Sequence, residues 1–96
     1  RIEKLLITDA QGRCVGLLTV KDIEKAQLHP TACKDDEGRL RVAAAIGTGT
    51  AQLERAGLLV AAEVDAIILD TAHGHSEGVI DSVKALRKAH KGLQII

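Results

Sequence analysis

No aromatic residue and no methionine occur in this chain of 96 residues, which also has one proline and two cysteines. Aromatic side chains bury large areas and stack on nucleobases. Their absence leaves a core of Leu, Ile, Val and Ala and weakens the case for nucleic-acid binding. Basic and acidic side chains number 13 each, so no net field favours nucleic acid or an anionic membrane surface. We therefore expect neither as a partner.

Membrane and targeting signals are also missing. No apolar run approaches the roughly 18 residues that cross a bilayer, and the opening residues RIEKLLITD lack a signal-peptide pattern. Cys14 and Cys33 show neither CxxC spacing nor a dense framework, which favours two reduced thiols. We expect a soluble, cytoplasmic protein. With no initiator methionine and an apolar last run, Gln94–Ile96, the chain resembles a piece of a larger protein.

The first 41 residues predict a β-hairpin, a short helix and a linker. The β-prone runs Leu5–Thr8 and Cys14–Leu18 flank the turn signal Asp9–Gly12. A helix is expected to follow as far as about Ala26. Residues 28–41 are polar and hold the proline and a charge cluster, which is typical of a linker.

From residue 42 onward, short apolar runs alternate with amphipathic segments. The runs Val42–Ile46, Ala66–Leu69 and Leu93–Ile96 predict strands, with helices between them capped at Thr50 and Ser76. The first run is continuously apolar, as expected of a strand buried on both faces. Crossovers of this length predict parallel neighbours in chain order. The β-α-β-α-β order fits either a doubly wound sheet or an eightfold barrel.

The stretch IILDTAHGHS, Ile67–Ser76, is the most informative of the chain. An apolar strand ends in Asp70, and a polar turn with a glycine follows. Parallel strands present such side chains at the carboxyl edge of the sheet, where open sheets and barrels both place ligands. From the residues alone, Asp70 and Thr71 either bind a ligand or only satisfy backbone donors at the strand end.

Several strings together resemble one family, the bacterial inosine monophosphate (IMP) dehydrogenases. GLLTVKDIEKA is similar to the end of the second CBS (cystathionine-synthase-type) module inserted in that family. ACKDDEGRLRVAAAIGTG resembles the linker back to the barrel and the strand that follows, and DTAHGHSEGV and LQII continue the match. The resemblance covers essentially the whole chain.

The resemblance implies an α/β fold class. Residues 1–27 would be the C-terminal part of a CBS module, 28–41 a linker, and 42–96 the N-terminal portion of a (β/α)₈ TIM barrel. The module part would consist of the predicted hairpin and helix. The barrel part would be a β-α-β-α-β unit with parallel strands.

The family oxidises IMP to xanthosine monophosphate with NAD⁺ in guanine nucleotide synthesis. Its members are commonly homotetramers and use a monovalent cation, K⁺, whose ligands would lie outside this chain. The family's catalytic cysteine loop and mobile flap lie beyond Ile96, and Cys14 and Cys33 match neither. The resemblance therefore implies that the chain holds no catalytic residue and is inactive alone.

Asp70 is the principal cofactor residue that the resemblance implies. Its carboxylate would accept hydrogen bonds from the nicotinamide-ribose hydroxyls of NAD, and Thr71, Ala72 and His73 would line the dinucleotide groove. A carboxylate can accept two vicinal hydroxyl protons, and small neighbours let the cofactor approach. We expect no metal site in the chain.

A second candidate site lies at Thr19 and Asp22. In CBS modules a T-x-x-D of this kind binds adenine or guanine nucleotides, with phosphate near the helix N-terminus. The same spacing is also that of a capping box, which needs no ligand. Both interpretations can hold together. One departure from the family is Glu63, which replaces a usual glycine, so we expect the preceding helix to end without a left-handed residue.

Three other functions stay open. Guanosine monophosphate (GMP) reductase shares the barrel but uses NADPH, and the CBS-like tail and two-histidine loop argue against it. Asp70, His73 and His75 would suit a metal hydrolase only if both histidines pointed inward from one strand, whereas the glycine between them predicts an exposed loop. The third is a non-catalytic fragment that senses nucleotides through Thr19 and Asp22.

Overall fold

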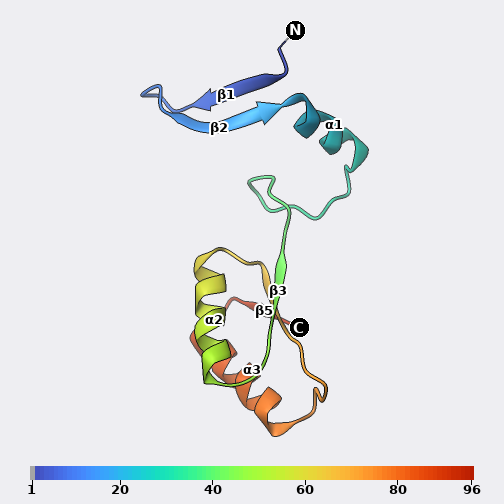
Figure 1. Cartoon of the computed structure of the whole chain (residues 1–96), viewed down its shortest axis with the longest axis vertical. Coiled ribbons are helices and arrows are strands. Elements are labelled where there is room, and N and C mark those ends of the chain that lie inside the picture. The colour runs from blue at the N-terminus through green and yellow to red at the C-terminus, as the bar shows by residue number, and fades with distance from the viewer. Residues whose placement is uncertain (1) are drawn as a thin grey trace. The chain divides into compact units, whose positions relative to one another are not determined.

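The computed structural model describes residues 2–96, which form two compact units that divide after Cys33 (Figure 1). This division falls within the predicted linker, residues 28–41. The first unit is a β-hairpin followed by a helix, as predicted. Strand β1, Lys4–Thr8, pairs antiparallel with β2, Cys14–Thr19. Helix α1 spans Val20–Leu28 and is slightly longer than expected.

The same five-residue turn, D-x-x-G-R, occurs once in each unit, at Asp9–Arg13 and at Asp35–Arg39. In each turn the aspartate carboxylate accepts hydrogen bonds from two backbone N–H groups and from the arginine Nε at 2.8 Å. The glycine, Gly12 or Gly38, has a φ of 78° that only glycine adopts readily. Residues 34–41 of the predicted linker are therefore a structured turn of the second unit.

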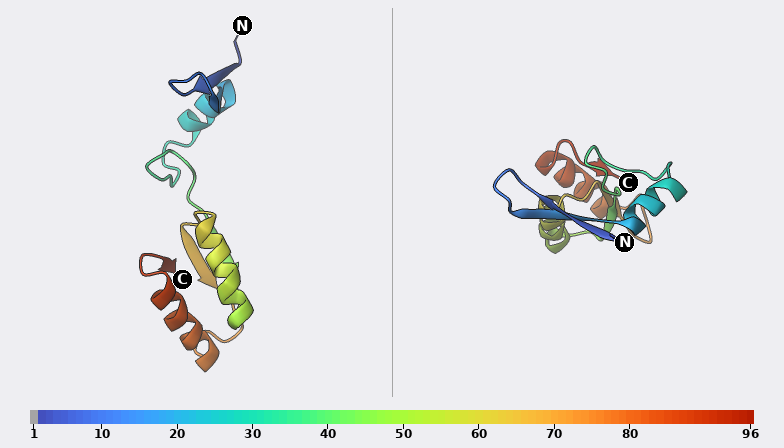
Figure 2. Two further views of the ribbon diagram at one scale, coloured as in Figure 1. Left: turned by 90° about the vertical axis from the view of Figure 1, so that its left-hand side faces the viewer. Right: turned by 90° about the horizontal axis from the view of Figure 1, so that it is seen from above.

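The second unit alternates strands and helices. Its elements are β3 (Ala43–Ile46), α2 (Thr50–Ala61), β4 (Ala66–Leu69), α3 (Glu77–Ala89) and β5 (Gln94–Ile95). The three strands are parallel and lie in the order β3-β4-β5. Both crossover helices lie on the same side of the strands (Figures 1 and 2). The predicted α/β class, parallel pairing and strand order are confirmed.

The core of this unit lies between the sheet and the two helices. Its buried members come from β3, α2, β4, α3 and the residue just before β5: Ile46, Ala56, Ile67, Leu86 and Leu93. Side chains alternate along a strand, so the opposite, helix-free face carries Ala43 and Ala45 on β3, and both are exposed. The expectation that β3 is buried on both faces is wrong for this chain, because α2 and α3 pack on one face only.

The predicted cap at Thr50 is also wrong. Gly49 is the N-cap of α2, with a φ of 100°, and Thr50 is the first helical residue. A β-branched residue does not readily take a positive φ, whereas glycine does. Ser76 is the N-cap of α3 as predicted, although its side chain accepts no hydrogen bond from the helix backbone.

Helix α2 ends on a left-handed residue after all. Glu63 has a φ of 66°. Its N–H donates to the Val60 carbonyl at 2.9 Å, and the Val64 N–H donates to the Leu59 carbonyl at 3.1 Å, which together form a Schellman motif. The Glu63 carboxylate accepts a hydrogen bond from Arg39 Nη1 at 2.9 Å. The geometry of the helix end, rather than the residue type, imposes this conformation.

Glu63 gives a prediction with a matched pair of variants. Glu63→Ala removes the ion pair to Arg39 and keeps the left-handed strain, whereas Glu63→Gly removes both. Left-handed backbone costs a non-glycine residue roughly 1–2 kcal/mol, and an exposed ion pair contributes about 0.2–1 kcal/mol. In the full-length protein we expect Glu63→Ala to melt lowest and Glu63→Gly to melt about 2–4 °C above it. Equal melting temperatures for the two variants would contradict this explanation.

Candidate functional site

The candidate site lies at the carboxyl edge of the parallel sheet. Ile46 and Leu69 are paired in the register of β3 and β4, so the next residues, Gly47 and Asp70, lie beside each other. The backbone N–H of Asp70 donates to the Ile46 carbonyl at 2.9 Å, which extends the ladder by one bond past the end of β4. Asp70 is therefore fixed by its backbone at the point where the strand becomes a loop.

The Asp70 carboxylate is exposed. Because Ile67 is in the core, alternation along β4 places Ile68 and Asp70 on the helix-free face of the sheet. Within residues 2–96 this carboxylate has no hydrogen-bond or ion-pair partner. Its side chain thus does not satisfy backbone donors at the strand end, and both oxygens can accept hydrogen bonds from a ligand.

The next three predicted residues continue in the same loop. The Thr71 hydroxyl is half-buried and accepts a hydrogen bond from the His73 N–H at 3.0 Å, so it shapes the loop. The His73 carbonyl accepts from the Ser76 N–H at 3.1 Å, which connects the loop to the start of α3. Ala72 and His73 are exposed. The structure therefore brings all four predicted residues together beside the end of β4.

His75 is exposed in this loop, as expected. In the described part of the chain, no three or more His, Cys, Asp or Glu side chains are grouped so that they could hold a metal ion. Cys14 and Cys33 are free and exposed. Among residues 2–96, no helix has the length and apolar character needed to cross a membrane.

In the first unit, Thr19 and Asp22 form a complete capping box at the start of α1. The Asp22 N–H donates to Thr19 Oγ1 at 3.2 Å, and the Thr19 N–H donates to Asp22 Oδ2 at 2.8 Å. The Thr19 hydroxyl also donates to Asp22 Oδ2 at 2.8 Å. These hydrogen bonds, above all the one from the Thr19 hydroxyl, lower the pKa of Asp22 below its ordinary value of 3.8. The capping interpretation is confirmed.

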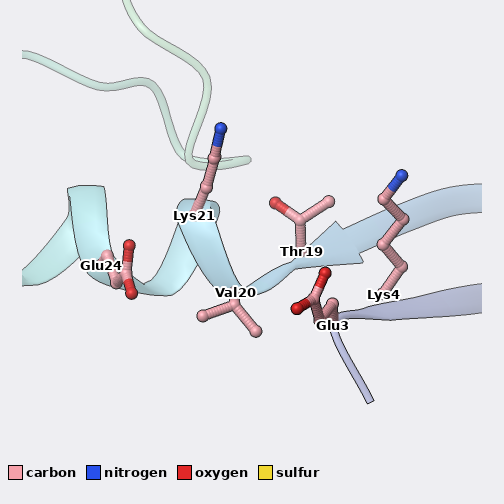
Figure 3. A pocket seen from close by; sticks show the side chains of 6 residues that line it. All are labelled: Glu3, Lys4, Thr19, Val20, Lys21 and Glu24. Atoms are coloured by element: carbon pink, nitrogen blue, oxygen red, sulfur yellow. The ribbon is translucent and has the colours of Figure 1, made fainter. Parts of the chain in front are cut away.

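A cavity of about 540 Å³ adjoins this helix start and is lined by Glu3, Lys4, Thr19, Val20, Lys21 and Glu24 (Figure 3). Lys4, Thr19 and Lys21 extend to one side of the ribbon, whereas Val20 extends to the other. Two cationic side chains near Thr19 would suit a phosphate. However, the N–H of Val20 already donates to the Glu3 carbonyl at 3.0 Å, so it is not available to a ligand.

The parallel β-α-β-α-β unit places the chain in the class of α/β proteins, in which open sheets and barrels bind ligands at the carboxyl edge. Comparison with known families is more specific. The family model described as "IMP dehydrogenase / GMP reductase domain" matches residues 13–96. The chain belongs to this family.

Curated relatives agree. The chain is 49% identical to inosine-5'-monophosphate dehydrogenase of Escherichia coli strain K12 and 54% identical to that of Rhizobium tropici. Each match covers 100% of this chain and 20% and 19% of the relative, respectively, so the chain spans about a fifth of their length.

A solved structure has a similar fold. GMP reductase from Trypanosoma brucei in complex with guanosine 5'-triphosphate superposes with a TM-score of 0.83 at 33% identity. The match covers 98% of this chain and 23% of that protein.

Proposed function

We propose that the whole protein to which this chain belongs is an IMP dehydrogenase, which oxidises IMP to xanthosine monophosphate with NAD⁺. The main support is the sequence identity to IMP dehydrogenases, 49% and 54% in the two relatives described, along all 96 residues. The protein would serve guanine nucleotide synthesis in the cytoplasm. It would be a homotetramer that uses K⁺ through ligands outside this chain.

The residues at the end of β4 fit the dinucleotide. When bound, NAD⁺ would accept the hydride, and the ribose attached to its nicotinamide has two vicinal hydroxyls. The exposed Asp70 carboxylate, free of partners within residues 2–96, would accept hydrogen bonds from both. Thr71 would hold the loop in shape through its bond to the His73 N–H. Ala72 and the exposed His73 would line the groove.

The chain would supply only part of this site. We propose that residues 1–27 belong to a CBS module, 28–41 to a linker and 42–96 to the start of a (β/α)₈ barrel. The cysteine loop would follow later in the whole protein, so the chain alone would not be catalytically competent. Thr19, which lines the cavity beside α1, and Asp22 would form a second site for adenine or guanine nucleotides, with Asp22 on the ribose.

GMP reductase is the alternative function. It is favoured by the similarity to the Trypanosoma brucei enzyme, at 33% identity. The higher identity to IMP dehydrogenases, 49% and 54% in the two relatives described, makes IMP oxidation the better-supported proposal.

Two assays on the full-length protein separate these activities. We expect IMP-dependent reduction of NAD⁺, followed by the absorbance of NADH. With GMP and NADPH, we expect ammonia release to stay at the level of an enzyme-free control. Ammonia release from GMP without IMP oxidation would overturn the proposal in favour of the reductase.

A further inference from the structure

One peptide group at the carboxyl edge is hydrogen-bonded on both sides. The carbonyl of the Ile46–Gly47 peptide accepts the Asp70 N–H at 2.9 Å. The N–H of the same peptide donates to the side-chain oxygen, Oε1, of Gln52 at 3.2 Å. Because the peptide is planar, fixing its N–H also fixes the direction of its carbonyl. Gln52 and Asp70 are thus connected through a single rigid group.

Gln52 is well placed for this contact. It is the third residue of α2 and its side chain is half-buried. A glutamine at this position of a helix usually reaches back to the N–H of the N-cap residue. Here the N-cap is Gly49, and the glutamine instead reaches two residues further, to Gly47. A Cβ added to Gly47 would lie 3.7 Å from Gln52 Cγ, so the two residues are in contact.

We propose that Gln52 is a positioning residue for the cofactor site. It orients the Ile46–Gly47 peptide, and this peptide holds the backbone of Asp70, whose carboxylate would meet the ribose of NAD. Hydrogen bonds in a chain also polarise one another, so the acceptor on Gln52 strengthens the bond to the Asp70 N–H. The inference rests on the proposed role of Asp70. Gln52 itself need not touch the cofactor.

The test uses three variants of the full-length protein. Gln52→Met keeps the length and volume of the side chain but removes the amide acceptor. Gln52→Glu keeps an acceptor, and its charge lies at a helix N-terminus, where a negative charge is favourable. Ser82→Ala is the matched control, because it also removes a side-chain hydrogen bond to backbone, from Ser82 Oγ to the Gly78 carbonyl at 2.7 Å, without touching the peptide beside Asp70.

We expect Gln52→Met to raise the KM for NAD⁺ about three- to tenfold, the effect of losing one hydrogen bond, and to leave the KM for IMP within twofold. In the absence of cofactor, the Asp70 amide of Gln52→Met should exchange its hydrogen at least about threefold faster than that of the wild type. Gln52→Glu should restore both values to within twofold of wild type, and Ser82→Ala should change neither.

Three results would overturn the inference while leaving the proposed role of Asp70 in place. One is an unchanged KM for NAD⁺ in Gln52→Met while Asp70→Ala raises it. Another is an equal rise in Gln52→Met and Gln52→Glu. The last is a rise in Ser82→Ala as large as that in Gln52→Met, which would show a merely structural effect. If Asp70→Ala itself leaves the KM for NAD⁺ unchanged, the proposed role of Asp70 fails, and the inference with it.

Discussion

Asp70→Ala in the full-length protein is expected to lower kcat/KM for NAD⁺ by about ten- to hundredfold. The substitution removes a charge-assisted acceptor for the ribose hydroxyls, an interaction worth roughly 1.5–3 kcal/mol. Each 1.4 kcal/mol corresponds to about a tenfold change. The KM for IMP should change much less, because residues outside this chain would bind its phosphate. Steady-state kinetics in which each substrate is varied in turn measures both values.

A melting curve of the same variant distinguishes binding from a structural role. The Asp70 carboxylate has no partner within residues 2–96, so its removal breaks no internal bond and should leave the melting temperature within about one degree. An unchanged KM for NAD⁺ together with a drop of several degrees would identify Asp70 as a structural residue instead. Glu54→Ala, on the exposed side of α2, is a suitable control for the loss of one acidic side chain.

The isolated 96-residue chain is expected to show weak protection of its backbone amides. Its buried apolar core is small, and 14 large apolar side chains of the described residues are exposed. They include Leu6 at 70%, Leu17 at 52% and Leu58 at 74% exposure. Strands β3 and β5 also leave two open edges. Protection factors below about 100 are expected, which correspond to opening free energies below ~3 kcal/mol.

Hydrogen exchange on a dilute, monomeric sample of the chain tests this expectation. The hairpin and α1 should exchange fastest, because α1 has no buried residue. Helices α2 and α3 should exchange more slowly, but their amides should not share one common rate set by a single cooperative unfolding step. Slow exchange of both helices at one common rate would show that the second unit is an autonomous domain and would contradict the prediction.

The sequence was sufficient for the order of elements and for placing Asp70 at the end of a parallel strand. Continuous apolar runs at Val42–Ile46 and Ala66–Leu69 indicated parallel strands, because long amphipathic segments follow each of them. The change from apolar residues to an acid at Asp70 marked the end of a strand. In the structure, the pairing of β3 with β4 places this strand end beside Gly47. These features depend on local patterns that the residues themselves carry.

Other features depend on contacts that a linear pattern does not contain. The left-handed conformation of Glu63 follows from the packing and hydrogen bonds at the end of α2, where a glycine would ordinarily be expected. Gly49 replaces Thr50 as the cap because the turn from β3 requires a positive φ. The proposed role of Gln52 depends on a hydrogen bond across the turn from the Gly47 N–H, and only its position three residues after Gly49 offered a signal.

Asp70 is proposed to bind the cofactor, and the most direct test is the equilibrium dissociation constant of NAD⁺ for the full-length protein. Calorimetric titration of the wild type and of Asp70→Ala, at the same protein concentration and salt, compares the two without the influence of the chemical step. We expect the dissociation constant to rise at least about tenfold in the variant, as loss of a charge-assisted hydrogen bond requires. Equal dissociation constants in two equally folded proteins would contradict the claim.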